Sequence, residues 1–501
     1  MEFSRNMKSF FAKIYAAILT RKLQKQQLHA VHIQNQILLD LVQKAKETKF
    51  GKAHHFEAIN SYEAYQRAVP VRDYEEFQVP YMQDLIAGES DVLWPGKPIY
   101  FCKTSGTTSG VKYIPITKDS MQHHIDAAKM ALLCYIQETG KADFLKGKLI
   151  FLQGSPLLDQ KSGIATGRLS GIVAHHVPAY LQKNRLPTYE TNCIEDWESK
   201  LDAIVEETID QNMTLISGIP PWVQMYFDKL IEKANTQKIK DIFKNFSLFV
   251  YGGVNFEPYR AKIEQSIGKK IDTIETYPAS EGFIAFQDSQ TADGLLLNIN
   301  AGIFFEFIPV ENYFDENPKR LTLAEIALNQ NYAIVLTTNA GLWSYSIGDT
   351  IKFVSKSPYR IKVTGRIKHF ISAFGEHVIG EEVEYALMTA AKEIGLAIAE
   401  FTVAPQVNPT DNCLPYHEWF IETAENIPNL SDFEHRVDEL LQEKNVYYKD
   451  LIQGKVLRRL RINILPKGAF IDYMKKEGKL GGQNKVPRLS NDRKIADQLI
   501  V

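Results

Sequence analysis

Cysteine is scarce in this chain of 501 residues, which contains four copies of it. Cys102, Cys134, Cys193 and Cys413 lie far apart in the sequence, and no Cys-x-x-Cys pair is present. This spacing argues against a disulfide framework and gives no indication of a zinc site. It fits a reducing compartment, so we expect a cytoplasmic protein.

The sequence also lacks an excess of basic charge and a long apolar run. Its net charge of −2 provides no field for a polyanion, so we expect no nucleic-acid partner. Near the N-terminus, charges such as Lys13 and Arg21 interrupt the apolar residues around Phe10 to Ile18, and we expect no stable membrane insertion. A weak role at a membrane surface stays open, although a helix packed on the protein body is the favoured interpretation.

The most informative stretch is Lys103–Lys112, which is rich in glycine, serine, threonine and lysine. Glycines let a backbone approach a ligand closely, while hydroxyl groups and lysine provide hydrogen-bond donors and positive charge. The stretch therefore indicates an anion cradle, most plausibly for nucleotide phosphates. It is not a Walker loop, because three residues separate Gly106 from Gly110 and Lys112 does not follow a glycine. A flexible surface loop is the alternative interpretation.

Short apolar segments after this stretch alternate with helical patterns. Strands are expected near residues 149–152, 214–218, 247–251 and 271–276, and a helix is expected from Pro220 to Lys233. This alternation predicts a mainly parallel sheet, in which ligands bind at the carboxyl ends of the strands. Ser105, Gly253 and Ser280 each come just after an expected strand.

The pattern becomes β-rich from Gly294 and changes again near residue 365, where we place a domain boundary. A separate α+β unit follows, in which Ser431 and Glu434 are expected to form a capping box. The fold class predicted is α/β, with a large N-terminal domain (residues 1–365) of mainly parallel sheet plus a β-rich portion. A smaller, mobile α+β domain (residues 366–501) completes the chain.

The order of three polar segments resembles the signatures of adenylate-forming enzymes, the superfamily that includes acyl-CoA synthetases and adenylation domains. Thr104–Lys112 resembles their phosphate loop, Tyr277–Glu281 their second signature and Tyr345–Asp349 their ribose-binding signature. Residues 365–368 resemble the hinge before their small C-terminal domain. Residues 304–309 and 483–488 are similar to one branch, the auxin-responsive-promoter family of acyl acid amido synthetases.

The resemblance implies a reaction in two halves. A carboxylic acid attacks the α-phosphate of ATP to give an acyl-AMP and pyrophosphate, and an amine, typically an amino acid, then displaces AMP. The small carboxylic acid and the amino acid are thus the implied substrates, and ATP and Mg²⁺ the implied cofactors. The residues implied to bind ATP are Thr104, Ser105, Gly106, Thr107, Thr108, Ser109, Gly253, Tyr277, Ala279, Ser280, Glu281 and Asp349.

Individual roles also follow from the resemblance. Glu281 would hold Mg²⁺, Asp349 would accept hydrogen bonds from the ribose hydroxyls, and Tyr277 would flank the adenine with the Gly252-Gly253 turn. Lys485, carried by the C-terminal domain, would be the catalytic lysine that reaches the α-phosphate during adenylation. Two alternatives stay open: a ligase that makes a thioester with CoA, and a nucleotide-binding protein without catalysis. The sequence leaves the oligomeric state undetermined.

Overall fold

The computed structural model describes residues 2–107, 110–177, 182–253, 256–367, 370–371, 373–376, 378–396, 398–410, 413–423, 427–477, 486 and 488–500. The chain forms two compact units. Unit 1 comprises Met1–Thr104, Lys112–Glu195 and Ser199–Ile367, and unit 2 comprises Ser105–Val111, Asp196–Glu198 and Lys368–Val501.

Within the described residues, the strands of unit 1 build an eleven-stranded sheet in the order β12-β13-β14-β15-β11-β10-β9-β8-β7-β3-β6. The five strands from β9 to β6 run parallel, and the others pair antiparallel. The parallel strands are β3 (Lys148–Phe151), β6 (Arg185–Leu186), β7 (Met213–Ser217), β8 (Leu248–Gly252) and β9 (Asp272–Ala279). The antiparallel strands are β10 (Gly282–Phe286), β11 (Leu295–Leu297), β12 (Ile303–Pro309), β13 (Asn331–Thr338), β14 (Tyr345–Lys356) and β15 (Tyr359–Arg366).

A second sheet has the order β2-β1-β5-β4. It comprises β1 (Tyr100–Thr107), β2 (Gly110–Ile116), β4 (Asp159–Lys161) and β5 (Ile164–Gly167). The glycine–hydroxyl stretch expected to be a loop therefore extends two adjacent strands. Backbone pairing continues through most of the motif because β-strands tolerate threonine and serine well when a neighbouring strand is available.

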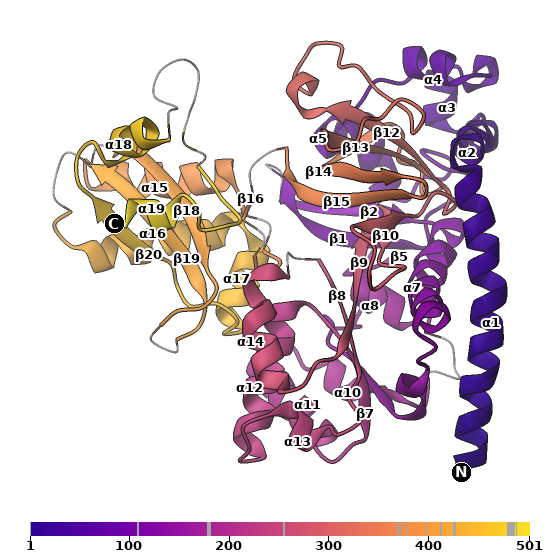
Figure 1. Cartoon of the computed structure of the whole chain (residues 1–501). Helices are drawn as coiled ribbons and strands as arrows, with labels where there is room; N and C mark the ends of the chain where they lie inside the picture. The colour runs from indigo at the N-terminus through magenta and orange to yellow at the C-terminus, as the bar shows by residue number, and fades with distance from the viewer. Residues whose placement is uncertain are drawn as a thin grey trace. The chain divides into compact units, whose positions relative to one another are not determined.

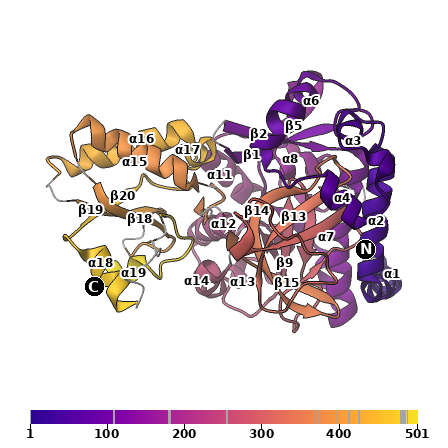
Figure 2. The same cartoon turned by 90° about the horizontal axis from the view of Figure 1, so that it is seen from above.

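Helices cover both faces of the parallel strands, as expected for a sheet of this kind. α7 (Lys118–Thr139) packs against β9 and β10, and α1 (Glu2–Leu28) packs against α7. Both views place α12 (Pro220–Lys233) and α14 (Glu257–Ile267) on the side of these strands away from α7 (Figures 1 and 2). α12 has the bounds expected from the sequence, since proline is well suited to the first turn of a helix. α11 (Trp197–Thr208) begins in the short Asp196–Glu198 part of unit 2 and continues in unit 1. The other helices of unit 1 are α2 (Ala30–Ala45), α3 (Lys49–Ala53), η1 (Phe56–Ala58), α4 (Tyr62–Ala68), α5 (Tyr74–Phe77), η2 (Gln78–Met82), α6 (Gln83–Ala87), η3 (Asp143–Lys146), α8 (Leu169–Ala174), α10 (Tyr189–Asn192), α13 (Ile239–Ile242) and η4 (Val310–Asn312).

The antiparallel strands have their own core, closed by α2. Gln34 of α2 is buried, and its Nε2 donates to the carbonyl oxygens of Ile299 and Ile303 over 2.7 and 2.8 Å. Its Oε1 accepts from the backbone N–H of Phe305 over 2.9 Å. One fully satisfied side chain therefore fixes the helix against the edge strand β12, while apolar residues of β11 to β15 fill the space beneath.

Unit 2 contains a sheet with the order β18-β19-β20 and a short pair, β16 and β17. Its strands are β16 (Phe370–Ile371), β17 (Val378–Ile379), β18 (Ile398–Gln406), β19 (Tyr416–Thr423) and β20 (Arg461–Leu465), and its helices are α15 (Gly380–Glu393), α16 (Leu430–Lys444), α17 (Val446–Gln453), α18 (Ala469–Lys476) and α19 (Ala496–Leu499). The expected capping box is wrong. Asn429 caps α16 by accepting from the N–H of Asp432, and Glu434 instead accepts from the N–H of Ile462 over 2.7 Å.

Candidate functional site

A hydrogen bond joins β1, the strand on which the glycine–hydroxyl segment begins, to the second polar motif. Cys102 lies on β1, two residues before Thr104, and its thiol contacts Ser280 Oγ over 3.1 Å. Because side chains alternate along a strand, Cys102 and Thr104 lie on the same face of β1. Burial raises the pKa of the Cys102 thiol to about 12, and the nearby negative charge of Glu281 acts in the same direction. The thiol is therefore protonated at neutral pH and donates to Ser280.

A second hydrogen bond joins the second motif to the third. The hydroxyl of Tyr277, on β9, donates to Asp349 Oδ2, on β14. Asp349 is only 6% exposed. In the sheet order, β15, β11 and β10 stand between β9 and β14. The antiparallel part of the sheet must therefore curl strongly, so that Asp349 of β14 comes back toward Tyr277 of the parallel part.

The position of Asp349 depends on an irregularity in β14. Ala333 of β13 pairs with Thr350, yet two residues later Val335 pairs with Ser346, so β14 has extra residues at this point. Gly348 lies in this bulge with a φ of +80°, a conformation that residues with a side chain rarely adopt. Its carbonyl accepts from the N–H of Ile367 over 2.7 Å. The bulge re-aims Asp349 toward Tyr277.

The two glycines after β8 lie beside the second motif. Gly252 pairs with Thr276 of the neighbouring parallel strand, and a Cβ at Gly252 would lie 2.3 Å from the Thr276 carbonyl oxygen. Gly253 follows with a φ of +82°. Gly253 directly follows Gly252 and Tyr277 directly follows Thr276, so Gly253 and Tyr277 come next on the two neighbouring strands. Both lie at the carboxyl ends of parallel strands, where ligands bind in such sheets.

Glu281, in the second motif, lies near Cys102 of β1 and near Tyr345 of the third motif. Its charge raises the pKa of Cys102, and it also raises the pKa of Tyr345, although burial is the larger cause for both. Among the described residues, the buried Tyr345 hydroxyl has no hydrogen-bond partner. Within the part of the chain that the structure describes, a half-buried carboxylate therefore lies near a buried hydroxyl that has no hydrogen-bond partner.

A buried polar network lies directly before the third motif. Glu306 and Arg320 form an ion pair of 3.3 Å with side chains 0% and 4% exposed. Ser344 Oγ donates to Glu306 Oε2 over 2.7 Å and accepts from Arg320 over 3.0 Å. Tyr62 donates to Glu306 over 3.1 Å. The residue preceding Tyr345 is therefore held by two charged side chains that water does not reach.

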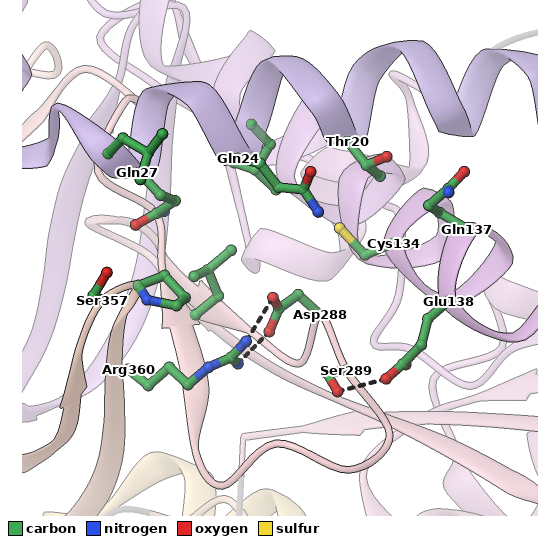
Figure 3. Close-up of a pocket in the computed structure, with 14 residues that line it drawn as sticks. Thr20, Gln24, Gln27, Cys134, Gln137, Glu138, Asp288, Ser289, Ser357 and Arg360 are labelled. Atoms are coloured by element: carbon green, nitrogen blue, oxygen red, sulfur yellow. Dashed lines mark hydrogen bonds and ion pairs between the residues drawn. The ribbon is translucent and has the colours of Figure 1, made fainter.

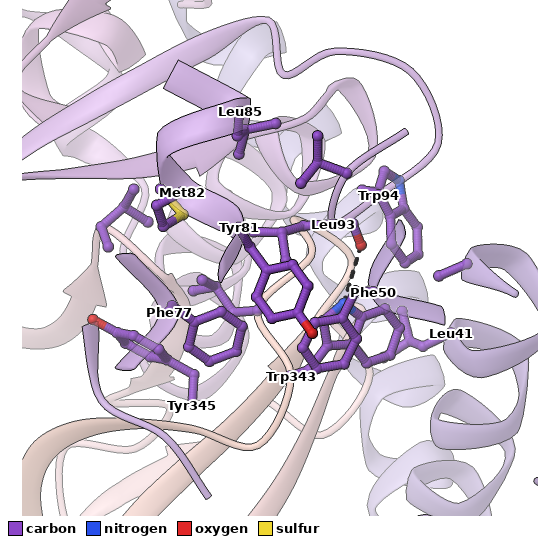
Figure 4. Packing of buried hydrophobic residues seen from close by; sticks show 14 of the residues in the cluster. Leu41, Phe50, Phe77, Tyr81, Met82, Leu85, Leu93, Trp94, Trp343 and Tyr345 are labelled. Carbon is purple, nitrogen blue, oxygen red and sulfur yellow. Dashed lines mark hydrogen bonds between the residues drawn. The ribbon is translucent and has the colours of Figure 1, made fainter. Parts of the chain in front are cut away.

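Aromatic packing supports the same segment from the other side (Figure 4). Trp343 is fully buried, stacks on Phe50 with centroids 5.7 Å apart, and donates through Nε1 to the Leu93 carbonyl over 3.0 Å. Phe77 packs against Tyr345 with centroids 5.9 Å apart. Two consecutive anchored residues, Trp343 and Ser344, fix the backbone from which Tyr345 to Asp349 extend.

The sequence-predicted site residues fall into three groups. Thr104, Gly253, Tyr277, Ala279, Ser280, Glu281 and Asp349 belong to the segments just described. For Ser105, Gly106 and Thr107 the description covers the backbone of β1 alone. Thr108, Ser109 and the candidate catalytic residue Lys485 lie outside the described residues.

Sequence reasoning missed Cys102 and the network of Glu306, Arg320 and Ser344. The even spacing of Cys102 from Thr104 in an expected strand could have indicated the first. Nothing in the sequence pattern pairs Arg320 with Glu306, because the two come from a loop and a strand that meet only in the folded chain.

A cavity of about 530 Å³ lies apart from these motifs, and none of their residues lines it. It lies beside α1 and α7, and Arg360 donates to both carboxylate oxygens of Asp288 at its wall (Figure 3). One of these bonds, from Nη2 to Oδ2, is 2.9 Å. The cavity includes Cys134 and the buried Gln27, whose Nε2 donates to the Leu297 carbonyl over 3.0 Å.

Comparison with known proteins identifies three consecutive family domains along the chain. Residues 19–271 match the GH3 family N-terminal domain, residues 296–366 the GH3 family central domain, and residues 381–494 the GH3 family C-terminal domain. The first match alone covers half of the chain.

Related proteins carry names of amide-forming ligases. Jasmonoyl–L-amino acid synthetase JAR4 of Nicotiana attenuata is 22% identical over 358 residues, covering 58% of this chain and 60% of that protein. The chain thus spans about three fifths of the length of this relative. JAR6 of the same plant is 21% identical over 451 residues, covering 74% of this chain and 75% of that protein.

A solved structure, the GH3.15 acyl acid amido synthetase, has the same fold. It aligns with a TM-score of 0.62 at 14% identity, over 97% of this chain and 96% of that one. The α/β fold class expected from the sequence is confirmed. So is the resemblance to acyl acid amido synthetases: the chain belongs to the GH3 family.

Proposed function

We propose that this protein is an ATP-dependent acyl acid amido synthetase, which activates a carboxylic acid as an acyl-AMP and transfers the acyl group to an amine, with an amino acid as the proposed acceptor. One observation carries the proposal. The contacts Cys102–Ser280 and Tyr277–Asp349 bring together three segments that are far apart in the sequence, in the order expected for phosphate, adenine and ribose binding.

In the first half-reaction, a carboxylate oxygen of the acid attacks the α-phosphorus, the bond to the bridging oxygen breaks, and pyrophosphate leaves. Negative charge accumulates on the phosphate oxygens as this happens, so donors already in place lower the barrier. Thr104 to Ser109 would provide these donors. The extension of β1 to Thr107 supports the role, because it holds the backbone of this part in place and leaves the hydroxyl groups to donate.

Asp349 would accept hydrogen bonds from the 2′- and 3′-hydroxyls of the ribose, since a carboxylate offers two acceptor oxygens. The Tyr277 hydroxyl restrains this carboxylate, and its ring would lie against the adenine beside the Gly252-Gly253 turn. The bulge at Gly348 supports this role, because it turns Asp349 toward the strand ends where the nucleotide would lie.

Mg²⁺ would be bound by Glu281 together with phosphate oxygens of ATP. No cluster of three or more histidine, cysteine, aspartate or glutamate residues suited to a metal occurs in the described part of the chain. A single half-buried carboxylate fits this ion, which keeps several waters and binds largely through its substrate. When bound, Mg²⁺ neutralises charge on the phosphates and the departing pyrophosphate.

Lys485, in the C-terminal domain of residues 366–501, would place its positive charge at the α-phosphate during adenylation. In the second half-reaction the amine nitrogen attacks the acyl carbon, the bond to the AMP oxygen breaks, and the nitrogen gives up a proton. Rotation of the C-terminal domain about residues 366–368 would expose the acyl-AMP to the amine.

The decisive experiment is a screen of carboxylic acids for ATP-dependent pyrophosphate release, followed by mass analysis of the products formed with each amino acid and with CoA. An amide product supports the proposal. A thioester with CoA and no amide would identify the alternative ligase, and ATP binding without acid-dependent pyrophosphate release would identify a non-catalytic nucleotide-binding protein.

A further inference from the structure

The outer side of α1 carries an unusual set of side chains. The helix packs on α7 through residues such as Ala16 and Thr20, which are buried. Ile18 is two residues from each of them and therefore lies on the opposite side of the helix. We call this side the outward face of α1. Its five large apolar residues are all exposed: Phe10 (61%), Phe11 (62%), Ile14 (45%), Tyr15 (46%) and Ile18 (60%).

Basic residues accompany these apolar residues. No aspartate or glutamate occurs between Glu2 and Asp40, although the whole chain has 60 acidic and 58 basic residues. Four exposed basic residues lie among these apolar positions or follow them: Lys13, Arg21, Lys22 and Lys25. None of the four forms an ion pair within the described residues. The segment is thus a local positive region on a chain of slightly negative net charge.

The outward face precedes the part of the chain that the family model matches. The match to the GH3 family N-terminal domain begins at residue 19, and Phe10 to Ile18 precede it. Because all five side chains are exposed, packing in the core of unit 1 does not account for their apolar character. Within the described part of the chain, no helix has an apolar stretch that would reach across a bilayer.

We propose that the outward face of α1 binds the surface of an anionic lipid bilayer, with its aromatic and aliphatic side chains entering the headgroup region and its basic side chains contacting lipid phosphates. Helices that combine an exposed apolar face with lysine and arginine bind in this manner. A second copy of the chain fits less well, because two such helices would bring like charges together, and α1 has no acidic residue after Glu2 to compensate for them.

The test is co-sedimentation of the full chain with vesicles of phosphatidylcholine alone and of phosphatidylcholine mixed with phosphatidylglycerol. Wild-type protein should pellet with the mixed vesicles and much less with the neutral ones. Raising the salt to about 1 M shortens the screening length to about 3 Å and should release it. Arg21→Gln should weaken binding about fivefold, since each basic residue near such a surface contributes a similar factor.

Two variants separate the outward face from general stickiness. The triple variant F10S/F11S/I18S should bind mixed vesicles at least about tenfold more weakly, because its apolar contacts are lost. The control V79S/F314S changes two apolar residues elsewhere on unit 1 that are 72% and 76% exposed, and should bind like wild type. Thermal unfolding and ATP-dependent pyrophosphate release should be unchanged in both variants.

Two results would overturn the proposal. One is equal binding of wild type and F10S/F11S/I18S to mixed vesicles. The other is a wild-type dimer, seen by sedimentation velocity, that does not bind vesicles and that the triple variant converts to a monomer. These results concern α1 alone, so they are independent of whether the chain forms amides.

Discussion

Replacement of Asp349 by asparagine tests the proposed nucleotide site most directly. Asparagine keeps the size of the side chain and one oxygen that can accept from the Tyr277 hydroxyl, so the fold around β14 should survive. The change removes the charge and one of two acceptor oxygens. A hydrogen bond to a charged group contributes about 1.5–3 kcal/mol and a neutral one about 1 kcal/mol. Losing one charged bond and weakening the other should therefore cost about 3 kcal/mol.

This cost corresponds to an increase of about 150-fold in the Kd for ATP, measured by isothermal titration calorimetry. The same titration with 2′,3′-dideoxy-ATP makes the test specific. Wild-type protein should bind this analogue more weakly than it binds ATP. Asp349→Asn should bind the analogue about as weakly as it binds ATP, because the analogue lacks the hydroxyl groups that the carboxylate would bind.

The chain contains a matched control on the same strand. Asp272, at the start of β9, accepts from the Tyr135 hydroxyl over 2.7 Å, so Asp272→Asn alters a second tyrosine–aspartate pair away from the strand's carboxyl end. It should leave ATP affinity unchanged. The reasoning is refuted if Asp349→Asn binds ATP like wild type, or if its loss of affinity is as large for the dideoxy analogue as for ATP.

The remaining predictions concern the support of the candidate site and the candidate catalytic residue Lys485. Gly348→Ala and Gly468→Ala both place a side chain at positive φ, and each should lower the free energy of unfolding in urea by about 1 kcal/mol. Only Gly348→Ala should also weaken ATP binding. If both variants bind ATP with the same affinity, the role of the bulge is contradicted. Glu306→Ala should lower the free energy of unfolding by about 3–5 kcal/mol, since it leaves a buried guanidinium without its ion pair. The pKa of Cys102 is about 12 in the folded protein and near its ordinary 9.0 in the unfolded chain. The contribution of this thiol to stability is therefore complete below pH 9 and is lost as the pH rises toward 12. Between these pH values the denaturation midpoint should fall less in Cys102→Ala than in the wild type. Lys485→Ala should slow acid-dependent pyrophosphate release while amide formation from supplied acyl-AMP continues, and an unchanged rate of release would remove this lysine from the mechanism.

Local pattern was sufficient for much of the fold. Pro220 at the first turn of α12, the strand β12 at Ile303–Pro309 and the alternation of strands and helices between residues 148 and 279 follow from short-range preferences that the tertiary structure does not override. The cap of α16 shows the limit of such signals. Asn429 and Ser431 are both good capping residues, and the choice of Asn429 follows from where the helix begins against the sheet, which frees Glu434 to bind the backbone of β20.

The sequence by itself predicted which residues would bind ATP, because glycine, hydroxyl and carboxylate groups appear in an order that resembles the signatures of adenylate-forming enzymes. Only the tertiary structure decided which of them meet. Asp349 reaches Tyr277 because the antiparallel strands curl and Gly348 permits a bulge, and both depend on contacts between residues distant in the chain. The burial of Glu306 with Arg320 is likewise a property of the assembled core, since each residue considered alone would be expected at the surface.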